Sequence, residues 1–195
     1  TITGNDRAFA AIKADGSVVT WGRNDFGGDS RLISAELTQV QSIAATEGAF
    51  AAVKADGSVV SWGLAIYGGD SSSVSASLSA VQSVAASAGA FAAIKADGSV
   101  VSWGDAEYAG DSSAVSDQLT QVQSITASKR AFAAIKADGS VVSWGEADYG
   151  GDSRAVNEQL INVQSIVATE YAFAAIRADG TVVTWGNTTL CGDRS

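Results

Sequence analysis

Residues 90–104 read Ala-Phe-Ala-Ala-Ile-Lys-Ala-Asp-Gly-Ser-Val-Val-Ser-Trp-Gly, and close copies of this string occur four more times in the chain. The copies follow one another every 41 residues without insertions, as two of their aromatic positions show: Phe9, Phe50, Phe91, Phe132 and Phe173, and Trp21, Trp62, Trp103, Trp144 and Trp185. A fixed period of this length is typical of folds that stack one small supersecondary unit repeatedly. We therefore expect residues 1–195 to form a single repeat domain of five units.

The centre of each unit predicts a β-hairpin. In the first copy Asp15-Gly16 separates two runs of β-forming residues, 9–14 and 17–22. A two-residue Asp-Gly loop between such runs favours a type I′ turn, which would pair Ile12 with Val19. Both faces of the hairpin are then largely apolar, as expected for a sheet that lies between two other sheets. The five expected hairpins are 9–22, 50–63, 91–104, 132–145 and 173–186.

A third strand and a short connection complete each unit. Residues 40–45, Val-Gln-Ser-Ile-Ala-Ala, predict a strand that precedes the hairpin of the next copy. Upstream, Ile33 and Leu37 stand four residues apart and are followed by Val40, which is helical spacing. Asp29 and Ser30 are good N-cap residues, so we expect one or two helical turns near 31–37. An extended loop is the alternative for so short a segment.

The repeat resembles one known family. The string Asp-Gly-Ser-Val-Val-Thr-Trp-Gly of residues 15–22, followed by Phe26-Gly27-Gly28, is similar to the repeat of the regulator of chromosome condensation family and of the related bacterial β-lactamase inhibitor proteins. The resemblance implies an all-β fold, a β-propeller of five 41-residue repeats with short three-stranded blades and a short helical or loop connection between blades. Two features depart from the family: its members usually have seven blades, and their characteristic histidine is absent from this histidine-free chain.

The ends of the repeats bear on whether the blades close into a ring. Five hairpins are complete, and only one connecting segment and the start of one strand are missing. A ring cut once would look like this, and unpaired end blades would expose apolar sheet faces. We therefore expect a closed ring of five blades, with an arc of a longer ring or of a larger complex as the alternative.

Composition excludes several classes of partner and cofactor. The formal net charge of -9 repels a phosphate backbone, so nucleic acid is not an expected partner. The chain has no histidine, and its single cysteine, Cys191, takes a loop position that holds glycine in the first copy, so zinc sites and internal disulfides are not expected. No apolar run approaches the roughly 20 residues that cross a bilayer, which argues against direct membrane insertion. No cofactor is indicated.

The repeated carboxylates are better explained by structural roles than by metal binding or catalysis. One aspartate stands at the same phase of every copy, where we interpret it as a helix cap: Asp29, Asp70, Asp111, Asp152 and Asp193. The aspartate of each Asp-Gly pair belongs to a turn, and the spacing of known calcium loops is absent. A serine or cysteine nucleophile would lack a histidine base. We expect neither a metal site nor catalytic residues, and hence no enzyme.

Differences among the copies indicate where a partner would bind. They concentrate in the turn before the first hairpin strand, such as Ser128-Lys129-Arg130, and in the segment after Trp-Gly, such as residues 64–66. Both segments lie at the open end of the hairpin, so we predict one variable-loop face, opposite the Asp-Gly turns, on a rigid scaffold. The predicted protein-binding residues are Leu64, Ala65, Ile66, Tyr67, Lys129, Arg130, Glu170 and Tyr171.

Two functional hypotheses follow. The first is a protein-binding propeller, either a recognition module or a peripheral subunit of a larger assembly. The uncharged segment 64–67 would form the apolar centre of its interface, unless Leu64 and Ile66 fold back onto the blade edge. The alternative is a multivalent binder of glycans or other small ligands, with one weak site per repeat near Phe26, Tyr67, Tyr108 and Tyr149.

Overall fold

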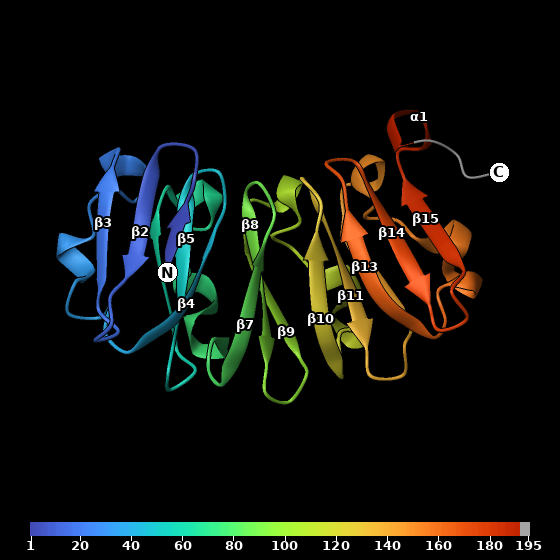
Figure 1. The fold of residues 1–195 in the computed structure, drawn as a ribbon, viewed down its shortest axis with the longest axis horizontal. Helices are drawn as coiled ribbons and strands as arrows, with labels where there is room; N and C mark the ends of the chain where they lie inside the picture. The colour runs from blue at the N-terminus through green and yellow to red at the C-terminus, as the bar shows by residue number, and fades with distance from the viewer. Residues whose placement is uncertain (192–195) are drawn as a thin grey trace.

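In the computed structural model, which describes residues 1–191, the chain forms five three-stranded antiparallel sheets that follow one another in sequence order (Figure 1). Each sheet is one blade, and the expected all-β fold of five repeated three-stranded blades is confirmed. The strands of the first two blades are β1 Ile2–Gly4, β2 Ala8–Ile12, β3 Val18–Gly22, β4 Val40–Ala45, β5 Ala49–Lys54 and β6 Val59–Gly63. Those of the other three are β7 Val81–Ala86, β8 Ala90–Lys95, β9 Val100–Gly104, β10 Val122–Ala127, β11 Ala131–Lys136, β12 Val141–Gly145, β13 Val163–Ala168, β14 Ala172–Arg177 and β15 Val182–Gly186.

Short 3₁₀ helices connect the blades. One follows the tryptophan strand of each of the first four blades, and a second precedes the next blade: η1 Asn24–Phe26, η2 Arg31–Ile33, η3 Ala65–Tyr67, η4 Ser72–Ser77, η5 Ala106–Tyr108, η6 Ser113–Gln118, η7 Ala147–Tyr149 and η8 Arg154–Gln159. The fifth blade is followed by α1 Thr188–Cys191. The helical connection is thus confirmed in 3₁₀ form. None of the helices in this part of the chain is long and apolar enough to span a membrane.

The aspartate, not the serine, caps the connecting helix. Ser30 occupies the N-cap position without a side-chain cap bond, whereas a carboxylate oxygen of Asp29 accepts a hydrogen bond from the N–H of Arg31 at 3.1 Å. Equivalent bonds join Asp70 to the N–H of Ser72 and Asp111 to that of Ser113. These Asx-type turns satisfy one of the N–H groups that a helix start leaves unpaired.

The hairpin loop is one residue longer than predicted. The N–H of Gly16 donates to the carbonyl of Lys13, and the N–H of Lys13 donates to the carbonyl of Ser17. Gly16 has a φ of 77°, so the loop is a three-residue turn that ends in a left-handed glycine instead of a type I′ pair. A carboxylate oxygen of Asp15 accepts from both the N–H and the hydroxyl of Ser17, which favours this longer loop.

The longer loop shifts the strand pairing by one residue. Phe9 lies opposite Trp21, and Ile12 lies opposite Val18, so the predicted pair of Ile12 with Val19 is wrong. Phenylalanine and tryptophan therefore share a face, where their rings stack with centroids 5.3 Å apart. We call this side of each blade its aromatic face, made in the first blade by Phe9, Ala11, Val19 and Trp21. The opposite side is its alanine face, made there by Ala8, Ala10, Ile12 and Val18.

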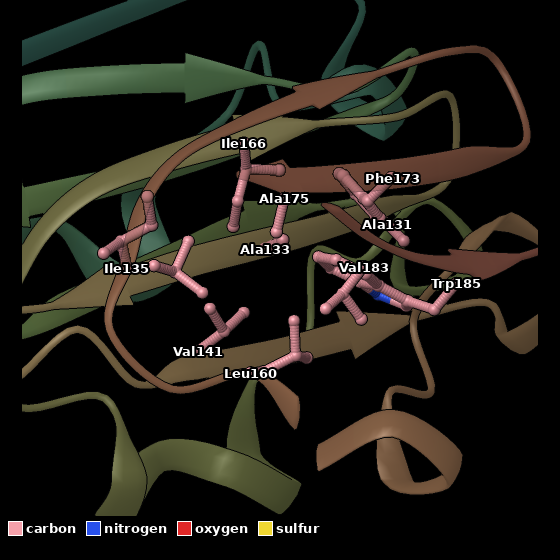
Figure 2. Packing of buried hydrophobic residues seen from close by; sticks show 11 residues of the cluster. Ala131, Ala133, Ile135, Val141, Leu160, Ile166, Phe173, Ala175, Val183 and Trp185 are labelled. Atoms are coloured by element: carbon pink, nitrogen blue, oxygen red, sulfur yellow. The ribbon is translucent and has the colours of Figure 1, made fainter. Parts of the chain in front are cut away.

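The core lies between blades. Four clusters of buried residues each join the alanine face of one blade to the aromatic face of the next, with a leucine from the connection and the valine that begins the next strand. Figure 2 shows the last of these clusters, in which Phe173 and Trp185 face Ala131 and Ala133, with Leu160 beside them. Small alanine side chains let the aromatic rings of the next sheet approach closely, which gives a dense apolar layer.

The tryptophan indole also ties each blade to the connection before it. The indole N–H of Trp62 donates to the carbonyl of Gly27, and that of Trp103 donates to the carbonyl of Gly68, both at 3.0 Å. Trp103 is only 3% exposed. Four of the five tryptophans therefore belong to the core between blades, and Trp21 is the exception at 44% exposed.

The five blades form an open arc, so the expected closed ring is wrong. The first and last blades lie at opposite ends of the longest axis of the molecule (Figure 1). Phe9 and Trp21 at one end, and Val167 and Ile176 at the other, are exposed apolar side chains. A sequence period fixes how many residues each blade has, whereas closure depends on the rotation from blade to blade.

Candidate functional site

The two variable segments of each copy come together at one end of the hairpins. The side-chain amide of Asn5 donates to the carbonyl of Phe26 at 2.8 Å. In the next three copies a hydroxyl takes the place of the amide and donates to the carbonyl of the matching tyrosine, as Ser87 does to Tyr108 at 2.7 Å. The same hydroxyl of Ser87 accepts from the N–H of Ala90, so one side chain fixes both loops.

Backbone hydrogen bonds link these loops from blade to blade. The N–H of Glu47 donates to the carbonyl of Ala88 at 2.8 Å, and the N–H of Ala88 donates to the carbonyl of Lys129 at 3.0 Å. Together with the bonds at Asp6 and Glu170 they make one row, which we call the backbone row: Asp6, Glu47, Ala88, Lys129 and Glu170. The loops are therefore held in register by the backbone, and their side chains are free to differ.

An aromatic row follows the same face. It consists of the aromatic residues that end η1, η3, η5 and η7, and of one tyrosine from the last loop: Phe26, Tyr67, Tyr108, Tyr149 and Tyr171. The rings of Tyr67 and Tyr108 lie 6.2 Å apart, and those of Tyr149 and Tyr171 lie 5.0 Å apart. Burial raises the pKa of Tyr67, and the phenol of Tyr108 adds to this, so the hydroxyl of Tyr67 keeps its proton at neutral pH.

Arg130 joins the two halves of this aromatic row. Its guanidinium lies 4.6 Å from the ring centroid of Tyr108 and 5.3 Å from that of Tyr149, so two aromatic faces share one cation. A guanidinium nitrogen of Arg130 also donates to the hydroxyl of Tyr108 at 3.4 Å. In the first copy Arg7 and Arg23 stack on Phe26 in the same manner, each at 5.0 Å.

The remaining charges of the predicted site pair with each other. The ammonium of Lys129 lies 2.7 Å from a carboxylate oxygen of Glu170, in the loop of the next blade. This hydrogen bond raises the pKa of Lys129 and lowers the pKa of Glu170. The hydrogen bond that the hydroxyl of Tyr171 donates to the carboxylate of Glu170 raises the pKa of Tyr171. All three groups stay in their neutral-pH charge states and link two loops across a blade boundary.

The apolar segment at 64–67 divides into two parts. Leu64 is half-buried and lies over Gly48, where a Cβ atom would meet a methyl group of Leu64 at 3.0 Å. Ile66 is 64% exposed, next to the exposed Ala65. Leu64 therefore packs on its own loop, as the fold-back alternative has it, whereas Ile66 offers an exposed apolar side chain.

The eight predicted residues thus lie along one row of loops. Lys129, Arg130, Glu170 and Tyr171 form a continuous cluster, and the ring contact of Tyr67 with Tyr108 connects this cluster to segment 64–67. The protein-binding prediction omitted Tyr108 and Tyr149, on which Arg130 rests. Their shared phase in the repeat with Tyr67 was the signal that could have found them.

The repeated aspartates serve local structure. The carboxylate of Asp152 forms a two-pronged pair with the guanidinium of Arg154, as Asp29 does with Arg31. These hydrogen bonds lower the pKa of each aspartate to about 2. In the described part of the chain, no group of three or more cysteine, aspartate or glutamate side chains gathers as metal ligands would. Asp193, the fifth expected cap, lies outside the described residues.

Comparison with known sequences gives no match, either to a family model or to a curated protein. Solved structures do match. Human WBSCR16 aligns with a TM-score of 0.65 and 18% identity over 95% of this chain and 61% of its own. Prp20p of Saccharomyces cerevisiae aligns with a TM-score of 0.61 and 17% identity over 95% of this chain and 56% of its own.

A third match is the CRINKLY ectodomain of the Arabidopsis thaliana receptor kinase ACR4, with a TM-score of 0.54 and 18% identity over 95% of this chain and 62% of its own. The chain therefore spans about three fifths of the length of these proteins. One structure of Prp20 names it as yeast RCC1. Identities this low establish the fold alone, and the fold is that of RCC1-like propeller blades, as the repeat indicated.

Proposed function

We propose that this chain is a non-enzymatic protein-binding module, a recognition module or a peripheral subunit of a larger assembly, that contacts its partner through the variable-loop face. The observation that carries this proposal is the aromatic row with Arg130 between two tyrosine rings, next to the exposed Ile66. Tyrosine and arginine are the residue types that most often dominate the energy of protein interfaces. They stand here on loops that backbone bonds hold in place, so little ordering is needed on binding.

The distribution of differences among the copies supports the same proposal. Positions shared by all copies make hairpins and core, whereas the loop positions change from copy to copy in size, charge and polarity. A face of this kind offers a different surface at each blade, which suits one extended partner better than five identical small ligands. The structural neighbour Prp20p has been studied for its binding to Gsp1p and histones, which supports a protein partner for loops on this fold.

The alternative, one small-ligand site per repeat, needs open aromatic platforms. Phe26, Tyr67, Tyr108 and Tyr149 are half-buried, and each contacts another ring or a guanidinium. Their faces are therefore used within the protein, which favours the protein-binding proposal. Calorimetric titration with a glycan panel that gave several equivalent sites would support the alternative instead.

The test is a matched pair of substitutions measured against the partner recovered by affinity capture with the whole chain. Ile66→Asp removes the exposed apolar side chain of the loop face, and Leu32→Asp changes the fully exposed Leu32 on the connection η2. We expect Ile66→Asp to weaken binding by about 2 kcal/mol and Leu32→Asp to leave it unchanged. Neither should move the melting temperature. Equal affinity of the Ile66→Asp and unmodified chains would contradict the loop-face assignment.

A further inference from the structure

Every interface between neighbouring blades has two unlike halves. One half is the aromatic face of a blade, and the other half is the alanine face of the blade before it. Five blades in an open arc form four such interfaces and leave one half of each kind uncovered. The protein therefore carries, at its two ends, the complementary parts of a fifth interface of the same design.

The first blade presents the uncovered aromatic face. Phe9 and Trp21 stack on each other as their counterparts do in the other blades, with ring centroids 5.3 Å apart. They are 45% and 44% exposed, whereas Phe50 and Trp62 of the second blade are 0% and 6% exposed. The difference measures what a preceding blade would cover.

The last blade presents the uncovered alanine face. A pocket of about 120 Å³ opens there, lined by Val167, Ala168, Thr169, Ala172, Phe173, Ala174 and Thr184. Ala172 and Ala174 hold the positions of Ala131 and Ala133, which in the fourth blade pack against Phe173. This volume is of the same order as the roughly 150 Å³ of a dry apolar cavity that accommodates benzene. Val167 and Ile176 surround this region with exposed apolar surface.

The backbone row could also continue by one more hydrogen bond. In the described residues it begins at Asp6 and ends at Glu170, and each of the first four members donates its N–H to the carbonyl of the member in the next blade. The next bond of the row would run from the N–H of Glu170 to the carbonyl of an Asp6. Side-chain packing and backbone hydrogen bonding therefore both fit a first blade as the neighbour of the last blade.

We infer that the alanine face of the last blade binds the aromatic face of the first blade of a second copy of this chain, head to tail. The two faces lie at opposite ends of the long axis and cannot meet within one chain (Figure 1). The second copy is the occupant because it supplies the side chains that already fill this interface four times in the molecule. Such a heterologous contact either closes a ring of chains or extends into a longer array.

The experiment is sedimentation velocity of the whole chain over a range of concentrations, with one variant at each end. Trp21→Glu places a charge on the aromatic face of the first blade, and Ile176→Glu places one on the alanine face of the last. We expect the unmodified chain to associate with rising concentration and each variant alone to remain monomeric. Each variant keeps the face that the other has lost, so an equimolar mixture should form a 1:1 dimer and nothing larger.

Controls separate this contact from misfolding and from the loop face. Leu32→Glu changes an exposed leucine on a connection and should assemble like the unmodified chain. Ile66→Asp should do the same, because the loop face takes no part. Val167→Glu is a second variant at the last blade and should behave like Ile176→Glu. An unmodified chain that stays monomeric at every concentration, an end variant that still associates alone, or a mixture that stays monomeric would each overturn the inference.

Discussion

Replacing Trp103 by alanine tests whether the stacked interfaces hold the protein together. The indole of Trp103 is 3% exposed and stacks on Phe91 with ring centroids 5.2 Å apart. A buried tryptophan removes about 200 Å² from water, worth about 5 kcal/mol at 25 cal/mol per Å². Alanine retains part of this burial, and the indole bond to the carbonyl of Gly68 is lost as well. We expect the free energy of unfolding to fall by about 3–5 kcal/mol.

Urea unfolding followed by far-ultraviolet circular dichroism gives this number directly. Trp103→Phe should cost less, about 1–2 kcal/mol, because a ring remains and mainly the hydrogen bond is lost. Leu32→Ala, at a fully exposed side chain, should change nothing measurable. If Trp103→Ala cost less than about 1 kcal/mol, the layer between the blades would not be the source of stability and the packing argument would fail.

Three further outcomes follow from local contacts. The buried hydroxyl of Ser102 has no hydrogen-bond partner among the described residues, so Ser102→Ala should leave the free energy of unfolding unchanged or raise it. Ser87→Ala breaks hydrogen bonds to two loops, so it should lower the free energy of unfolding, measured with urea, by about 1–3 kcal/mol. Ala80 has a φ of 54° on an exposed turn, a conformation that glycine adopts more easily than alanine. Ala80→Gly should therefore raise the free energy of unfolding by about 0.5–1 kcal/mol, which a higher melting temperature would show. The pKa values of Asp29 and Asp152 are about 2, below the usual 3.8, so both groups stabilise the fold above pH 3.8, and denaturant midpoints should drop as the pH falls from 3.8 through 2.

The repeat made most of the fold predictable from sequence. The strand predicted at residues 40–45 is β4, Val40–Ala45, because a run of β-formers in a constant context leaves little choice. The hairpin register was not predictable from the Asp-Gly pair alone. The serine after the glycine decides it, since its N–H and hydroxyl both bond to Asp15 and favour a three-residue loop. A shift of one residue moves every side chain to the other face.

The prediction of a closed ring was wrong for a different reason. The sequence showed that both faces of a blade are apolar. We expected a closed ring because closure would cover the apolar faces of the end blades. The structure leaves Phe9 and Val167 exposed at opposite ends of the arc. The rotation between blades is set by how alanine and aromatic side chains fit together across sheets, a three-dimensional property that no period in the sequence encodes.

The candidate site was predictable in place but not in detail. Comparison of copies located the loop face, because variable residues collect where the scaffold does not need them. It could not show that Leu64 supports its loop over Gly48 while Ile66 remains free. Nor could it show that Arg130 lies between two tyrosines of neighbouring blades, since that contact joins positions 22 and 19 residues apart through the packing of two sheets.

The near identity of the copies explains why function and assembly fall on different residues. Residues such as Phe91 and Trp103 must fit the alanine face of the blade before, and Ala90 and Ala92 must fit the aromatic face of the blade after, so a change in one copy needs a matching change in its neighbour. Such positions can join one blade to another, including a blade of a second chain, yet they cannot distinguish one partner from another. Specific recognition must therefore come from positions that face no other blade, and Ile66 is the clearest apolar side chain of that kind on the loop face.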